Sequence, residues 1–151
     1  GIRDYKVTGV QTCALPISRV FNAAVWLHGT DLYFETEGSM GSAAPEAGVH
    51  DRRSAIQKVA AVSLDEIVAI AKRPTVDLVK MDIEGAELRC LESAGASFWE
   101  LRPHIVLEPH QVNGNVNTEA LLEIFEARKY ATVVMPQVGL HLPLIPATPL
   151  P

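Results

Sequence analysis

Apolar and polar positions along this chain follow patterns typical of short strands and helices. An apolar run over residues 19–26 and an alternating run over 32–34 predict two strands joined by a short turn. Residues 37–53 are rich in Gly, Ser, Ala and Pro, which predicts a loop. A further apolar run over 59–62 predicts another strand.

The clearest helix start is Ser63-Leu64-Asp65-Glu66. The Ser63 side chain can accept a hydrogen bond from the Glu66 amide, while the Glu66 carboxylate accepts one from the Ser63 amide. Apolar residues continue at helical spacing to Ala71, and Pro74 follows soon after. This pattern predicts a helix over 64–71 with a capping box at its start.

Strands and helices alternate downstream of this helix, which is typical of crossover units and predicts an α/β fold with a mostly parallel sheet and flanking helices. The strand over 76–82 is too apolar to have a solvent-exposed face, so we expect it at the centre of that sheet. The elements expected in order are strand 76–82, helix 86–94 ended by Gly95, a helical turn over 97–100, strand 104–108, loop 109–117, helix 118–129 and strand 130–135.

The C-terminal residues 136–151 hold five of the ten prolines, so we expect an edge segment or a loose end there. Residues 131–151 are apolar and long enough to cross a bilayer. Their prolines remove amide donors that a helix in lipid needs, so we expect no membrane span.

Composition narrows the class of protein. With 48% apolar and 21% charged residues, the 151-residue chain has the balance of one globular domain. Its net charge is −5 and its longest basic run is Arg52-Arg53, which argues against a nucleic-acid surface and favours a small-molecule partner. Cys13 and Cys90 stand 77 positions apart without zinc-site spacing, which fits a reducing, cytoplasmic compartment. Nothing in the sequence indicates the oligomeric state.

Residues 1–18 have neither a helical nor a strand period. This segment resembles the translated sequencing-adapter read-through that occurs at broken ends of predicted metagenomic proteins. We therefore expect three parts: a non-native segment over 1–18, a partial domain over 19–135 that lacks its first strands, and the proline-rich tail over 136–151.

Candidate catalytic and binding residues lie where two predicted strands end. Lys80, Asp82 and, if extended geometry persists, Glu84 share one side of the chain, and Glu108 and His110 follow the next strand. Ligands of open α/β sheets bind beyond the carboxyl ends of strands, so these side chains could surround one crevice.

Structural roles are open for the same residues. Lys80 could simply neutralise Asp82, Glu84 and Glu87 could favour the positive start of a helix, and His110 could be solvated. Asp82 is the strongest functional candidate, because an acid that closes an apolar central strand is costly unless paired or used. The enzymatic interpretation depends on that strand being interior and on Asp82 facing a shared cleft.

The segment Val76-Asp77-Leu78-Val79-Lys80-Met81-Asp82-Ile83-Glu84-Gly85-Ala86-Glu87-Leu88 lies between Ser63-Leu64-Asp65-Glu66-Ile67 and Leu107-Glu108 with His110. Together these residues closely resemble the FkbM-type S-adenosylmethionine-dependent methyltransferases. Asn22-Ala23-Ala24-Val25 also matches a segment that ends an earlier strand in that family. The resemblance runs from about Arg19 to Met135.

The resemblance implies a truncated class I methyltransferase (Rossmann-like) fold with S-adenosylmethionine across the carboxyl edge of the sheet. Asn22 and Ala23 would border the adenine, and Asp82 and Glu84 would face the methionine end and the acceptor; Asp82 and Glu108 are expected among the cofactor-binding residues. The chain lacks the family's glycine-rich loop and acidic ribose-binding residue, so we expect it to be inactive alone.

The resulting hypothesis is O-methylation of a hydroxyl on a sugar or other secondary metabolite. Asp82 or His110 would be the base, and Lys80 would hold the acidic pair. An alternative is a divalent-metal-dependent phosphotransferase or hydrolase that uses Asp82, Glu84, Glu108 and His110 as ligands. A third is a sheet-forming piece without catalytic activity.

Overall fold

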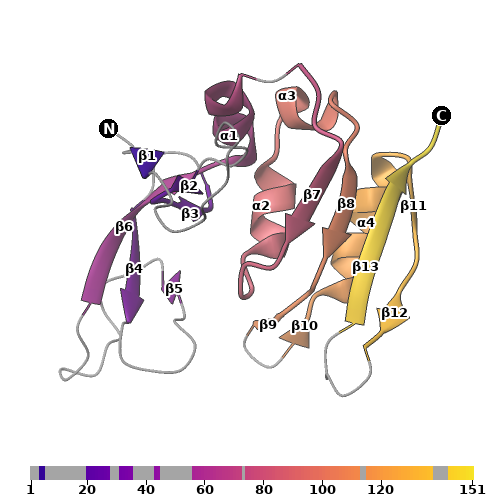
Figure 1. The fold of residues 1–151 in the computed structure, drawn as a ribbon. Coiled ribbons are helices and arrows are strands. Elements are labelled where there is room, and N and C mark those ends of the chain that lie inside the picture. The colour runs from indigo at the N-terminus through magenta and orange to yellow at the C-terminus, as the bar shows by residue number, and fades with distance from the viewer. Residues whose placement is uncertain are drawn as a thin grey trace, which may run out of the picture. The chain divides into compact units, whose positions relative to one another are not determined.

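The computed structural model describes residues 4–5, 20–27, 31–35, 43–44, 56–72, 74–112, 115–137 and 143–151 (Figure 1). They belong to two compact units. Unit 1 comprises residues 1–24 and 29–62, and unit 2 comprises residues 25–28 and 63–151. The loop predicted over 37–53 lies outside the described residues except at 43–44, and so do most of residues 1–18.

The described residues of unit 1 lie mainly in strands. β1 (Asp4–Tyr5) pairs antiparallel with β2 (Val20–Phe21). A second sheet has the order β3 (Ala24–Val25), β6 (Ile56–Val62), β4 (Asp31–Glu35) and β5 (Ala43–Ala44). The strand predicted over 19–26 is split into β2 and β3, which belong to different sheets, whereas β4 covers the strand predicted over 32–34. β6 lies between β3 and β4 and pairs antiparallel with β4.

Unit 2 opens with helix α1 (Leu64–Ala71), whose predicted capping box is confirmed. The Ser63 amide donates to the Glu66 carboxylate over 2.8 Å, and the Glu66 amide donates to the Ser63 hydroxyl over 3.2 Å. The helix ends where Lys72 adopts a left-handed conformation with φ 51°. Local sequence alone was sufficient to place this element.

The prediction of a mostly parallel sheet is wrong. The sheet of unit 2 has the order β11 (Tyr130–Thr132), β13 (Pro143–Pro149), β8 (His104–Leu107) and β7 (Leu78–Met81). Only β7 and β8 run parallel, whereas β13 is antiparallel to both of its neighbours, and β12 (Met135–Pro136) also pairs antiparallel with β13.

The proline-rich tail accounts for this difference, because it supplies an inner strand rather than an edge segment or a loose end. Ile145 and Ala147 of β13 are fully buried in the core. Pro146 has no N–H to donate, but its carbonyl accepts from the Val133 amide at the irregular step between β11 and β12. Apolar burial therefore outweighs the loss of a ladder hydrogen bond here.

The central position predicted for the strand over 76–82 is also wrong. β7 lies at the edge of the sheet that the described residues form, with β8 as its hydrogen-bonded neighbour there. Leu78 is consequently 60% exposed. The apolar character of this strand predicted its existence correctly but not its neighbours. The condition that the strand be interior is therefore not met, and its position in the sheet gives the enzymatic interpretation no support.

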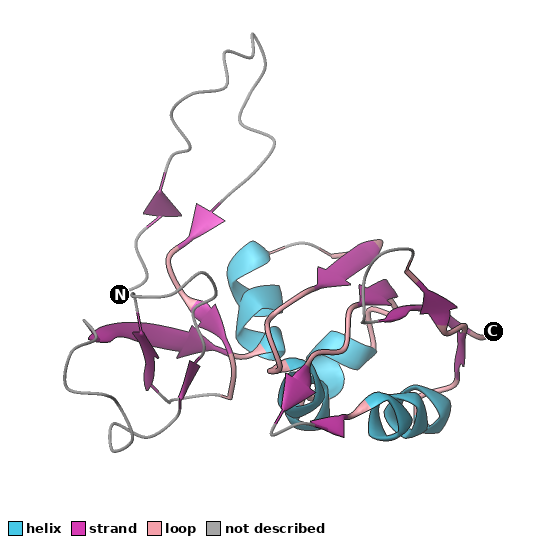
Figure 2. Ribbon diagram, turned by 90° about the horizontal axis from the view of Figure 1, so that it is seen from below, coloured by secondary structure: helices cyan, strands magenta, loops and turns pink. Residues whose placement is uncertain are grey.

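The described residues contain four helices, all in unit 2. Helices are cyan in Figure 2. The helices after β7 are α2 (Glu87–Ser93), the single turn α3 (Ala96–Trp99) and α4 (Thr118–Ala127). α2 contacts α4. The buried core includes Leu91 of α2, Phe125 of α4 and Ile105 and Leu107 of β8.

After β8, the two short strands β9 (Gln111–Val112) and β10 (Asn115–Val116) pair antiparallel. None of the helices in the described ranges has the length and apolar character needed to cross a membrane.

Candidate functional site

The candidate site begins in the turn between β7 and α2. The extended geometry considered for Glu84 does not persist, because β7 ends at Met81 and Glu84 adopts φ 53°. Gly85 follows with φ 100°, a conformation that side chains disfavour, so the sharp turn predicted there is confirmed. This left-handed turn, rather than strand alternation, positions the Glu84 carboxylate.

Asp82 pairs with Lys80, as the sequence suggested. The Lys80 ammonium lies 2.6 Å from Asp82 Oδ2, and both side chains are substantially exposed. This hydrogen bond lowers the pKa of Asp82 against the opposing effect of burial, so Asp82 is an ionised carboxylate with weak basicity. Because Asp82 is exposed and paired, burial cost is no longer an argument for its function.

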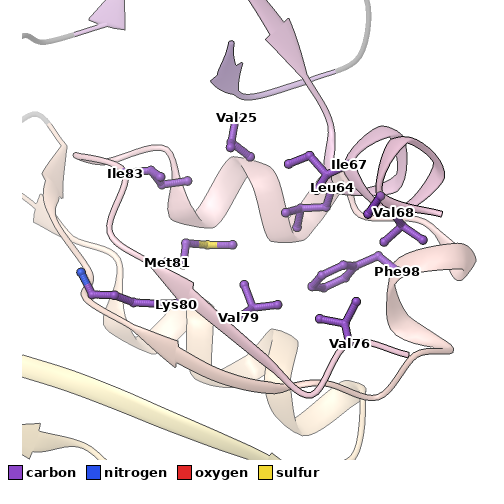
Figure 3. A pocket seen from close by; sticks show the side chains of 11 residues that line it. Val25, Leu64, Ile67, Val68, Val76, Val79, Lys80, Met81, Ile83 and Phe98 are labelled. Atoms are coloured by element: carbon purple, nitrogen blue, oxygen red, sulfur yellow. The ribbon is translucent and has the colours of Figure 1, made fainter. Parts of the chain in front are cut away.

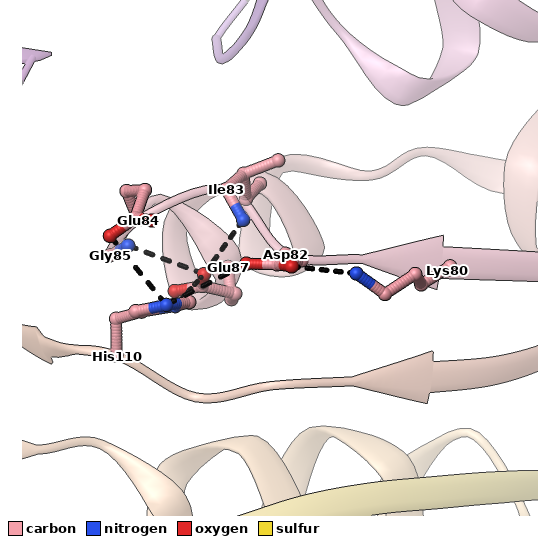
Figure 4. Close-up of polar contacts among 7 residues, drawn as sticks. All are labelled: Lys80, Asp82, Ile83, Glu84, Gly85, Glu87 and His110. Carbon is pink, nitrogen blue, oxygen red and sulfur yellow. Dashed lines mark hydrogen bonds and ion pairs between the residues drawn. The ribbon is translucent and has the colours of Figure 1, made fainter. Parts of the chain in front are cut away.

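His110 lies where the ends of β7 and β8 meet. The parallel register pairs Met81 with Leu107, so residues just beyond each of them meet at the same end of the sheet. His110 Nε2 lies 3.7 Å from Asp82 Oδ1 and 3.6 Å from Glu84 Oε2, as Figure 4 shows. The convergence of Asp82, Glu84 and His110 expected from the sequence is therefore present.

Glu87 is the residue that sequence reasoning missed as part of the site. It is only 2% exposed, and its Oε1 lies 2.8 Å from His110 Nδ1. The same oxygen accepts from the backbone amides of Ile83 at 3.1 Å and Gly85 at 3.2 Å. The only sequence signal was its place just after the glycine turn, which predicted a helix-start carboxylate equally well.

Electrostatics favour the charged form of His110. Burial lowers the pKa of the imidazole, but the hydrogen bond to Glu87 and the charges of Glu87, Glu84 and Asp82 raise it, and the net direction is upward. The ring is mostly buried, with 13% of its side chain exposed. His110 is thus a proton-accepting group in a strongly acidic setting.

The remaining predicted residues are less closely connected to this group. The Glu108 amide donates to the Met81 carbonyl over 3.0 Å, and its carboxylate acts on Lys80 as a nearby charge. Asn22 and Ala23 belong to unit 1, so their predicted contact with an adenine stays a prediction.

The geometry also allows a cation. One ligand atom each from Asp82, Glu84 and His110 lie within 4.8 Å of one another, whereas Glu108 does not belong to this group of the described residues. However, the Lys80 ammonium is already bonded to Asp82 and repels a divalent ion at the same carboxylate. This pairing disfavours a dedicated metal centre.

An apolar pocket of about 170 Å³ lies elsewhere in unit 2, beside β7 and α1 (Figure 3). Its walls carry aliphatic and aromatic groups and the side chain of a single charged residue, Lys80, so it offers no carboxylate or imidazole for chemistry. The residues that line it include Val25, Leu64, Ile67, Val79, Met81 and Phe98.

Comparison with known proteins gives one match. A family model described as the methyltransferase FkbM domain matches residues 11–131 of the chain. No curated protein matches the chain, and no solved structure does. The matched range contains every residue of the candidate site.

Proposed function

Because this chain belongs to the FkbM methyltransferase family, we propose that its reaction is S-adenosylmethionine-dependent O-methylation of a hydroxyl on a sugar or other secondary metabolite. The 151 residues alone are expected to be inactive, because they lack the family's glycine-rich loop and acidic ribose-binding residue. The observation that carries the proposal is the family match over residues 11–131, which contains the group of Asp82, Glu84, Glu87 and His110. The structure of this group supports the proposal in two ways: its charge beyond the end of β7 and the identity of its base.

The charge of the group fits the proposed cofactor. When bound, S-adenosylmethionine supplies an electrophilic methyl group on a positively charged sulfonium. Asp82 and Glu84 present carboxylates beyond the end of β7, and Glu108 adds a third close to Lys80. Negative groups at the carboxyl end of strands stabilise a cationic ligand there. Within unit 2, Asp82 and Glu108 are the residues proposed to hold it.

The two candidate bases differ in their electrostatics. Lys80 lowers the pKa of Asp82, which makes this carboxylate a weak proton acceptor. The pKa of His110 is shifted upward, and Nε2 faces the acidic group. A base works best when its pKa lies near the working pH, so His110 is the proposed acceptor of the hydroxyl proton. Asp82 then acts through its charge, held in place by Lys80.

A phosphotransferase or hydrolase with a divalent ion is the weaker candidate. Only three of its four predicted ligands converge in the described residues, and Lys80 competes for one of them. Tight Mg²⁺ or Mn²⁺ binding in the absence of S-adenosylmethionine binding would favour it over methyl transfer.

The test combines binding and turnover. Calorimetry measures the Kd for S-adenosylmethionine, and release of S-adenosylhomocysteine is followed with a panel of sugars and hydroxylated metabolites. Because the chain lacks the family's glycine-rich loop, both assays are repeated with a fusion protein in which the glycine-rich segment of another family member precedes the chain. Failure of the fusion protein to bind S-adenosylmethionine would overturn the proposal.

Two substitutions assign the roles. His110→Asn keeps a donor for Glu87 but removes the base, so kcat should fall by about 10²- to 10⁴-fold. Asp82→Asn should likewise reduce turnover far more than cofactor affinity. His104→Asn changes an exposed histidine of β8 and is the matched control. Unchanged turnover in His110→Asn would exclude the histidine as base.

A further inference from the structure

Glu87 is an ionisable side chain in a place where such groups are rarely found. It is 2% exposed, and carboxylates are almost never buried to this degree unless they are paired or used. Three donors meet at its Oε1: the backbone amides of Ile83 and Gly85, and the ring of His110 (Figure 4). These three contacts compensate for the solvation that the side chain loses on burial.

This arrangement decides which nitrogen of His110 carries the proton. An ionised carboxylate can only accept hydrogen bonds, so the 2.8 Å contact requires a proton on Nδ1. In a neutral imidazole the lone pair must then be on Nε2. Nε2 is the nitrogen that faces the open side of the group, near Asp82 and Glu84.

We propose that Glu87 is a positioning residue for methyl transfer: it holds His110 as the Nδ1–H tautomer, with Nε2 turned toward the acceptor hydroxyl, and stabilises the imidazolium that forms. The role rests on the proposed function. The hydroxyl proton passes to Nε2 as the oxygen takes the methyl group and the methyl–sulfur bond breaks, which leaves a thioether and an imidazolium. Glu87 keeps its negative charge throughout.

Three carboxylates face the imidazole, and they come from two places. Glu87 approaches Nδ1 from α2, whereas Asp82 and Glu84 approach Nε2 from the turn after β7. Asp82 is also bonded to Lys80, which reduces its effect on the ring. Glu87 therefore makes the closest contact and, unlike the other two, is shielded from solvent.

The first measurement needs neither a variant nor an acceptor. Nitrogen chemical shifts of His110 in the 151-residue chain report directly which ring nitrogen is protonated in the neutral form. We expect Nδ1–H to be the dominant tautomer. A ring protonated at Nε2 would overturn the inference.

The second measurement uses Glu87→Gln, which keeps an acceptor oxygen for the two backbone amides but removes the charge. In the fusion protein, kcat should fall by about 10²-fold or more, because an orienting carboxylate next to a catalytic histidine contributes up to about 10⁴-fold. KM for the acceptor should be unchanged within about 3-fold, since Glu87 is buried away from it. The acidic limb of the kcat/KM profile should move to lower pH as the pKa of His110 falls.

Control variants separate this role from a structural one. Glu87→Asp retains the charge and should restore the acidic limb toward its original position. Glu92→Gln changes an exposed carboxylate of the same helix, paired with Arg89 over 3.3 Å, and should alter nothing. A folded Glu87→Gln protein with unchanged kcat and pH profile would show that Glu87 does not position the base.

The two proposals fail in different ways. Nδ1–H in a protein that binds no S-adenosylmethionine would overturn the proposed function while supporting the contact between Glu87 and His110. Nε2–H in a protein that methylates hydroxyl acceptors would overturn the role of Glu87 alone.

Discussion

His110 shows how the meaning of one residue depends on its neighbours. In the sequence it could be a solvated loop residue, but in the fold its ring lies between a buried carboxylate and two exposed ones. Glu87, whose role in the sequence could have been that of a helix-start acid, is what gives the histidine a defined orientation. The chemistry therefore belongs to the pair rather than to either side chain.

The raised pKa of His110 predicts how stability depends on pH. The folded protein binds this proton more tightly than the unfolded chain, so His110 contributes stability that is fully present below the ordinary value of 6.5 and is lost as pH rises through the folded-state pKa. The free energy of unfolding of the wild type, relative to His110→Asn, should thus be larger at about pH 6 than at about pH 8.

Urea unfolding at a series of pH values measures this difference. His104→Asn, which changes the exposed histidine at the start of β8, is the comparison variant. A difference between wild type and His110→Asn that stays constant over the range would contradict the upward shift.

At the scale of elements, α1 and α3 are joined by a carboxylate that the sequence did not single out. Asp65 in the first turn of α1 accepts from the amides of Gly95 at 2.6 Å and Phe98 at 3.2 Å, and from the Ser97 hydroxyl. Gly95, at which the sequence predicted the end of helix 86–94, has φ −86° and so lacks the left-handed conformation common in helix-ending glycines. Its lack of a side chain matters instead because a Cβ would come within 3.0 Å of Asp65 Oδ1.

Asp65→Ala should therefore destabilise unit 2 by about 0.5–2 kcal/mol, the usual cost of losing an N-terminal helix cap. Burial raises the pKa of Asp65, but its hydrogen bonds to Ser97, Gly95 and Phe98 together have the larger effect, and the net shift is downward. The loss of stability in this variant should therefore be present at neutral pH and disappear in acid. Chemical denaturation beside Glu123→Ala, an exposed acid of α4, measures the effect. Equal stability of the two variants would show that this cap contributes nothing.

At the scale of the whole molecule, the C-terminal strand β13 is an inner strand of the sheet of unit 2 and contributes to its core. β13 lies between β8 and β11, and Ile145 and Ala147 are buried in the core. The proline content of this segment suggested a peripheral tail because prolines cannot donate to a ladder. Burial of its apolar residues decided the outcome.

Ile145→Ala should reduce the free energy of unfolding by about 2–5 kcal/mol, as expected for truncating a fully buried aliphatic side chain. Leu150→Ala, at a position 47% exposed in the same C-terminal segment, should change it by less than about 0.5 kcal/mol. Equilibrium urea unfolding gives both values. Similar small effects for the two variants would mean that the segment is peripheral after all.

What the sequence determined by itself was mostly local. The capping box at Ser63 and Glu66, the helices and the strands β7 and β8 depend on contacts within a few residues, and the structure confirms them. The motif around Asp82 also indicated the family, and the family model that matches residues 11–131 confirms it.

Only the tertiary structure decided the rest, because those features depend on residues far apart in the chain. The edge position of β7 follows from which strands pair, and the mixed sheet follows from β13 inserting beside β8. Likewise, Glu87 and His110 stand 23 positions apart, and their contact exists because a left-handed turn and a parallel register bring both to one end of the sheet. Such pairings are set by burial summed over the whole core, which no local pattern contains.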